Sequence, residues 1–117
     1  MNTRIAYLYR DGANNKQGGE VVLAGALSDE QIADIRHACD DGQWFIPGDV
    51  GLPELQAVWV EKGYPLTADD HVWHELVDFE ATADSPTLAM TAAAFYERFV
   101  SVAHWDVAGA ITRIGLG

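Results

Sequence analysis

The densest group of side chains able to do chemistry lies between residues 69 and 80. Its histidines and acids are Asp69, Asp70, His71, His74, Glu75, Asp78 and Glu80. On a helix, the two histidines, Glu75 and Asp78 would share one face, because residues three and four apart are neighbours there. Imidazole nitrogens and carboxylate oxygens are ligands that Zn²⁺ and other divalent ions accept. A helical interpretation therefore makes His71, His74 and Glu75 candidate metal ligands.

The same segment can also form a strand, in which successive side chains point to opposite faces. His71 and Glu75 would then lie on one side, and His74 and Asp78 on the other. A single ion could not bind all of them. The H-x-x-H-E spacing also differs from the H-E-x-x-H and H-x-x-E-H motifs of metalloproteases. We favour this second interpretation, in which the histidines pair with neighbouring carboxylates and fix a local turn, and we expect no cofactor.

Charge is the strongest signal in the composition. The chain has 18 Asp and Glu against seven Lys and Arg, which gives a formal net charge of −11. No basic residue occurs between Lys62 and Arg98. Such a chain repels nucleic-acid phosphates and anionic lipids, so we expect no direct binding to nucleic acids or membranes. The candidate residues for binding a basic partner are Asp40, Asp41, Asp69, Asp70, Glu75, Asp78 and Glu80.

Three functions are compatible with these residues. The leading hypothesis is a non-enzymatic interaction module that binds a basic protein surface, because an acidic patch can steer a basic partner and speed its association. The first alternative is a metal-dependent enzyme that uses His71, His74 and Glu75. The second is an inhibitor that imitates the phosphate row of a nucleic acid. The sequence contains no Gly-x-Ser-x-Gly nucleophile motif and no phosphate-binding glycine pattern, which favours a non-enzyme.

The length and the N-terminus favour one cytoplasmic domain. The chain has 117 residues and no Pro- or Ser-rich linker. It begins with Met1 and Asn2 and enters an alternating segment without an apolar leader. Cys39 is the only cysteine, so an internal disulfide is impossible.

Alternation with a period of two predicts the strands. It predicts a hairpin of strands 3–10 and 20–27 with a nine-residue loop, 11–19, between them. A third strand is expected over 43–46. Within 67–80 we expect a strand after one helical turn, with a helix as the alternative.

Two helices carry clear start signals. The first begins after the N-cap Ser28, where Gln31 completes a capping box, and it ends before Gly42. The second begins after Thr91 and ends near His104.

The remaining segments carry weaker signals. The segment 55–59 fits no single element. Residues 108–117 form a last strand or a loose end, within a tail, 105–117, that we expect to be loosely attached. The order of elements predicts an α+β fold: a mostly antiparallel sheet of three to five strands with two helices packed on one face.

Three stretches also occur together in a way that suggests a family. They are Tyr9-Arg10-Asp11 with Asn15-Lys16, Phe45-Ile46-Pro47 with Val50-Gly51-Leu52-Pro53, and Asp69-Asp70-His71-Val72-Trp73-His74-Glu75. They resemble a group of small, uncharacterised bacterial proteins over most of residues 3–100. No activity is established for that group. The resemblance therefore implies a stand-alone cytoplasmic bacterial domain and no site residues.

Overall fold

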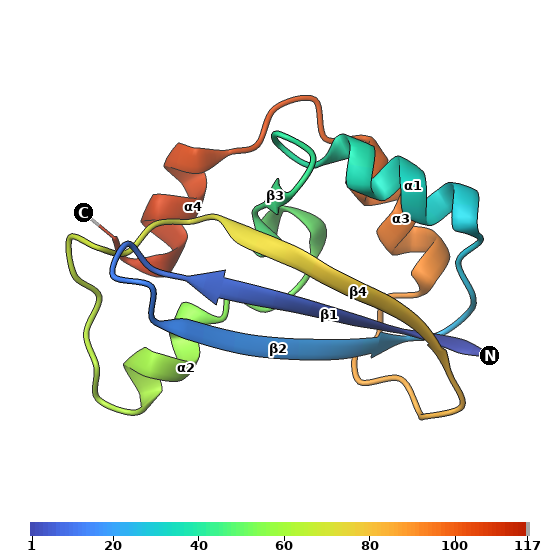
Figure 1. The fold of residues 1–117 in the computed structure, drawn as a ribbon, viewed down its shortest axis with the longest axis horizontal. Helices are drawn as coiled ribbons and strands as arrows, with labels where there is room; N and C mark the ends of the chain where they lie inside the picture. The colour runs from blue at the N-terminus through green and yellow to red at the C-terminus, as the bar shows by residue number, and fades with distance from the viewer. Residues whose placement is uncertain (117) are drawn as a thin grey trace.

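The computed structural model describes residues 1–116 and shows a four-stranded antiparallel sheet with helices on one side (Figure 1). The strand order is β2-β1-β4-β3. In chain order the elements are β1 (Asn2–Arg10), β2 (Lys16–Leu23), α1 (Asp29–Ala38), β3 (Trp44–Phe45), the 3₁₀ helix η1 (Pro47–Val50), α2 (Gln56–Glu61), β4 (His74–Thr82), α3 (Ala92–Val100) and α4 (Val107–Ile114). The predicted α+β class is confirmed, and Gly117 lies outside the described residues.

The hairpin of β1 and β2 is tighter than predicted. Its register pairs Arg10 with Lys16, which leaves five residues between the strands. The predictions of a nine-residue loop and of a second strand that continues to Leu27 are therefore both wrong. Gly19 looks like a turn residue in the sequence but lies within β2. A Cβ there would lie 2.5 Å from Leu55 Cδ2, so close packing requires this glycine.

The first helix, α1, begins as predicted. The Ser28 hydroxyl accepts a hydrogen bond from the Gln31 amide, and the Gln31 side chain accepts one from the Ser28 amide. The helix ends at Ala38. Asp41 and Gly42, with φ of 51° and 73°, then reverse the chain toward β3.

The segment 67–80 follows the strand interpretation. The Asp70 amide donates to the Thr67 carbonyl at 3.1 Å, which closes one turn, and the chain then enters β4. β4 pairs with β1 on one side and with β3 on the other. β3 has two residues, so it is shorter than the strand predicted over 43–46.

The helix α3 has the predicted N-cap, since the Thr91 side chain accepts from the Ala94 amide at 3.1 Å. It ends at Val100, one turn before the predicted end near His104. No helix within residues 1–116 has both the length and the apolar character needed to cross a membrane.

The prediction of a strand or loose end over 108–117 is wrong for the described residues. Val107–Ile114 is the helix α4. At its start, the Asp106 side chain accepts from the Gly109 amide at 2.9 Å. At its end, Gly115 has a φ of 79°, the left-handed conformation that commonly terminates a helix.

A small cluster of apolar side chains packs α4 against the domain. Ala110 is completely buried and clusters with Ile46 and Val72. Trp105 and Ile114 pack against this cluster. The tail 105–117 was expected to be loosely attached. Its described part, residues 105–116, is instead attached to the domain through this small apolar cluster.

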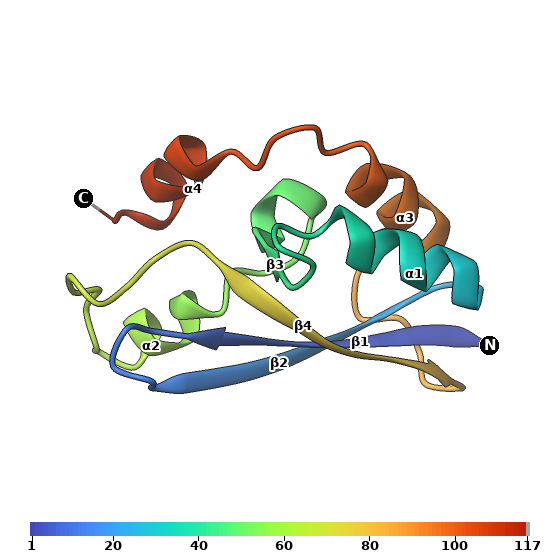
Figure 2. The same ribbon diagram turned by 45° about the horizontal axis from the view of Figure 1, so that its top comes forward.

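The main core lies between the sheet and the helices. Ile5, Tyr7 and Tyr9 alternate along β1 and point toward the helices, where Phe95 and Phe99 of α3 are also buried. Figure 2 shows α1, α3 and α4 on the same side of the sheet. Within residues 1–116 the opposite face carries no helix, so it exposes the polar side chains of the strands.

Candidate functional site

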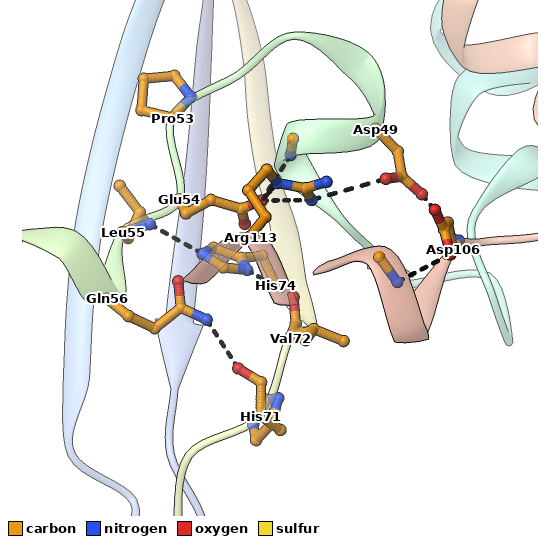
Figure 3. A network of polar contacts seen from close by, with 12 residues as sticks. Asp49, Pro53, Glu54, Leu55, Gln56, His71, Val72, His74, Asp106 and Arg113 are labelled. Carbon is orange, nitrogen blue, oxygen red and sulfur yellow. Dashed lines mark hydrogen bonds and ion pairs between the residues drawn. The ribbon is translucent and has the colours of Figure 1, made fainter. Parts of the chain in front are cut away.

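His74 is a core residue and not an exposed ligand. It is 0% exposed, and both ring nitrogens bond to the backbone (Figure 3). Its Nε2 accepts from the Leu55 amide at 3.1 Å, and its Nδ1 donates to the Val72 carbonyl at 3.2 Å. This pattern assigns the neutral tautomer with the proton on Nδ1. Burial lowers the pKa of His74 to about 3, which keeps the ring neutral.

His71 is bonded in the same way but as the other tautomer. Its Nδ1 accepts from the Trp73 amide at 3.0 Å, and its Nε2 donates to the Arg10 carbonyl at 2.6 Å. The predicted pairing of the histidines with carboxylates is therefore wrong, because both rings bond to main-chain groups. Their predicted role in fixing the local chain path fits these bonds.

Glu75 lies on the opposite face of β4 from His74, because successive strand residues alternate. Its Oε2 is 3.2 Å from Arg10 Nε on the open face of the sheet. His71, His74 and Glu75 are thus not brought together. No three His, Cys, Asp or Glu side chains are arranged to hold a metal ion anywhere in the part of the chain that the structure describes.

The acidic candidates also lie in separate places. Glu75 pairs with Arg10, and Glu80 lies 3.4 Å from Arg4. Asp78 is exposed between them on β4. The remaining four lie in loops: Asp40 and Asp41 in the turn between α1 and β3, and Asp69 and Asp70 before β4. Asp40 borders a small hollow in the surface, and Asp69 and Asp70 border a larger one.

An open cleft of about 700 Å³ lies between the β1–β2 turn, α2 and the loop that precedes β4. Its lining includes the carboxylates of Asp11, Asp69 and Asp70 and the aromatic rings of Trp59 and Tyr64. Two stretches that are distant in the sequence, 11–16 and 59–70, therefore contribute to one surface.

Hydrogen bonds hold the two sides of this cleft together. The Gly12 amide in the turn donates to the Asp69 carbonyl at 2.8 Å. The Tyr9 hydroxyl donates to Asp70 Oδ1 at 2.5 Å, and the Thr67 amide donates to Asp70 Oδ2 at 2.8 Å. Asp70 is thereby fixed in place, while its neighbour Asp69 uses only its backbone for these contacts.

Asp11 is fixed as an ionised group. Its carboxylate accepts hydrogen bonds from the amides of Ala13 and Asn15 and from the Asn15 side chain. The side-chain hydrogen bond from Asn15 is the main reason that the pKa of Asp11 is lowered. A group of this kind carries its full negative charge at neutral pH.

The cleft offers free negative charge beside aromatic surface. Within residues 1–116, none of its three aspartates forms an ion pair with Lys or Arg. Trp59 is half-buried and packs edge-on against Tyr9, with ring centroids 5.3 Å apart. Tyr64 is 68% exposed. Two lysines, Lys16 and Lys62, also line the cleft and leave it one negative charge in excess.

A second, smaller hollow of about 330 Å³ is lined by Asp40, Trp44, His71 and Trp73. The Asp40 amide donates to the Trp44 carbonyl at 2.7 Å, which places the acid beside the ring at the edge of the sheet. This hollow repeats the combination of a carboxylate with aromatic side chains.

Comparison with known proteins identifies no relative of this chain. No family model matches it, and no curated protein or solved structure matches it. The fold and the cleft therefore define the protein as a small antiparallel α+β protein with an acidic, aromatic surface cleft. The resemblance to small bacterial proteins stays an expectation.

Sequence reasoning missed the aromatic half of the cleft. Tyr64 lies between Gly63 and Pro65, and an aromatic residue in such a break is a visible sign of an exposed ring. Trp59 carried no comparable sign, because its segment fits no single element by pattern. Asp11 looked like an ordinary turn residue.

Proposed function

We propose that the protein is a non-enzymatic, cytoplasmic interaction module whose cleft binds a basic side chain of a partner protein. The observation that carries this proposal is the set of cleft carboxylates, Asp11, Asp69 and Asp70, which have no ion-pair partner in residues 1–116 and lie beside aromatic rings. An exposed cluster of acids alone would favour solubility. The added aromatic surface favours recognition.

Arginine is the side chain that this combination suits best. Its planar guanidinium pairs with carboxylates through two hydrogen bonds and also stacks on aromatic faces. In the cleft, Asp69 supplies a carboxylate without another hydrogen-bond partner in the described chain, and Tyr64 supplies an exposed ring. A cation over such a ring gains roughly 0.5–1 kcal/mol at an exposed site.

The charge of the whole molecule supports the same kind of partner. The net charge of −11 attracts a basic protein over distances longer than a contact. This attraction raises the association rate, and salt weakens it. The cleft supplies the local contact, and the net charge supplies the steering.

Fluorescence anisotropy with a fluorescein-labelled Arg-Gly repeat peptide tests the proposal. The variant Asp69→Asn removes one cleft charge and keeps the side-chain size. The matched control, Asp78→Asn, removes one charge from the exposed face of β4. We expect Asp69→Asn to weaken binding by about fivefold and Asp78→Asn by less than about twofold, since exposed ion pairs contribute up to roughly 1 kcal/mol.

Two further results complete this test. Tyr64→Ala should weaken binding of the Arg-Gly peptide more than binding of a Lys-Gly peptide, because the guanidinium stacks more readily on a ring. Equal losses for Asp69→Asn and Asp78→Asn would show that only the overall charge matters, and the cleft would then have no specific role. Binding that salt does not change would also contradict the proposal.

A further inference from the structure

A separate cavity lies on the other side of α2, between this helix and α4. Its volume is about 250 Å³, slightly below the usual range for ligand pockets, which starts at roughly 300 Å³. Its apolar walls are Ala57, Val60, Leu66 and Ile114, and its polar lining includes Glu54 and Gln56. None of these residues belongs to the cleft of the proposed function.

Two buried acceptor atoms on residues lining this cavity have no partner. They are Glu54 Oε2 and Gln56 Oε1, and they are the buried side-chain polar atoms without a hydrogen bond in residues 1–116. Gln56 is 1% exposed. Its Nε2 donates to the His71 carbonyl at 2.7 Å, so the amide cannot turn over without losing that bond. Figure 3 shows the amide oxygen of Gln56 turned toward the Glu54 side.

All the hydrogen bonds donated to the Glu54 carboxylate go to one of its two oxygens. Its Oε1 accepts from the Gly48 amide at 3.1 Å and from Arg113 Nε and Nη2 at 3.0 and 2.6 Å. An arginine more often bridges both oxygens of a carboxylate. Here Oε2 remains without a donor. A Cβ on Gly48 would lie 2.3 Å from Glu54 Oε1, so glycine is what allows this arrangement.

The unpartnered atoms determine what the cavity can bind, and because both are fully buried a ligand must displace part of the cavity wall to reach them. Both are acceptors, so the ligand must donate hydrogen bonds. The lining also holds Glu61, which has no ion pair in the described residues, so Glu54, Glu61 and Arg113 together leave one negative charge in excess. The apolar walls suit a short hydrocarbon chain. We propose that this cavity is a binding site for a small primary alkylammonium ion, whose N–H groups donate to Glu54 Oε2 and Gln56 Oε1.

Titration of the ¹⁵N-labelled protein with n-butylammonium chloride tests this site. The Gln56 side-chain amide is the reporter, because its oxygen would accept from the ligand. We expect a saturable shift of this resonance. Tetramethylammonium, a cation without N–H donors, and n-butanol, a chain without charge, should each bind at least about tenfold more weakly, which corresponds to the loss of the hydrogen-bonded charge.

Two tryptophan variants separate the cavity from the general surface. Val60→Trp places a large ring at the rim of the cavity and should abolish the shift. Val100→Trp makes the same change at a similarly exposed valine on α3 and should preserve it. The polar residues are untouched in both variants, and far-UV circular dichroism checks that both fold.

The proposal is overturned by any of three results. They are no saturable shift with n-butylammonium, equal binding of n-butanol or tetramethylammonium, and an unchanged shift in Val60→Trp. The first result would mean that the two oxygens stay closed off from the cavity. None of these outcomes affects the cleft, because binding of the Arg-Gly peptide depends on different residues.

Discussion

At the scale of single residues, His74 connects its own segment to Leu55, which lies 19 positions earlier in the chain. Its ring bridges the Leu55 amide before α2 and the Val72 carbonyl before β4. His74→Leu keeps an apolar volume but leaves both backbone groups buried without partners. We expect this variant to lose about 2–4 kcal/mol of unfolding free energy, measured by urea denaturation at pH 7.

The control is His37→Leu on α1, where the histidine is exposed. This change should alter the unfolding free energy by less than about 0.5 kcal/mol. Equal effects of the two substitutions would mean that the bonds of His74 contribute no stability.

The same residue makes stability depend on pH. Burial lowers the pKa of His74 from 6.5 to about 3. Between these values the unfolded chain binds a proton that the folded protein excludes. The contribution of His74 is therefore complete above pH 6.5 and is lost as the pH falls toward 3, at roughly 1.4 kcal/mol per pH unit. Urea denaturation at pH 7 and pH 4.5 should show a steeper loss for the wild type than for His74→Leu.

Other titrating groups do not disturb this comparison. Glu54, whose pKa is raised by burial, is present in both proteins, so its effect cancels. Parallel pH profiles for the two proteins would contradict the assignment of His74 as a neutral core residue.

At the scale of elements, one arginine fastens α4 to the domain. Arg113 Nη2 lies 2.6 Å from Glu54 Oε1 and 3.6 Å from Asp49 Oδ1, and both acidic side chains are 13% exposed. Arg113→Met would leave two nearly buried carboxylates without a cation. We expect a loss of about 2–3 kcal/mol in unfolding free energy, since Arg113 itself is partly exposed. Urea denaturation measures this loss.

A double-mutant cycle assigns this loss to the ion pair. Adding Glu54→Gln to Arg113→Met should recover part of the stability, because no uncompensated charge then remains at residue 54. The control Lys62→Met removes an exposed cation without an ion pair in residues 1–116 and should be nearly neutral. Additive losses in the double variant would contradict the coupling.

The elements differ in how well local sequence predicts them. α1 and α3 were predictable because Ser28 and Thr91 are strong caps followed by apolar spacing. α2 has six residues and no side-chain cap, so its helical form depends on packing. α4 does have signals, Asp106 before it and Gly115 after it, but Gly109 inside it weakens the helical pattern.

The candidate site was less predictable than the fold for a geometric reason. The alternation of β4 separates His74 from Glu75, and the strand interpretation anticipated that separation. Which acids face a common hollow depends on contacts between distant segments, such as the Gly12 amide with the Asp69 carbonyl. No local pattern carries that information.

At the scale of the whole molecule, most of the negative charge is unpaired. Of the 18 acidic side chains, six form ion pairs with arginine within residues 1–116: Glu20, Asp49, Glu54, Glu75, Glu80 and Asp84. Three of these surround Arg4 at the open face of the sheet. Twelve acids remain to repel one another, and under the proposed function they also attract a basic partner. The charge that would steer such a partner therefore opposes the compact state.

Because the unpaired acids repel one another, we predict that salt stabilises the protein. Repulsion between exposed charges is screened over about 8 Å at 0.15 M ionic strength. We expect the unfolding free energy to rise on the order of 1 kcal/mol between 10 mM and 300 mM NaCl. The triple variant Glu61→Gln, Asp78→Asn, Glu97→Gln removes three exposed charges and should show a smaller rise, with higher stability at low salt. Stability that falls with salt would instead show that the ion pairs of the open sheet face outweigh the repulsion.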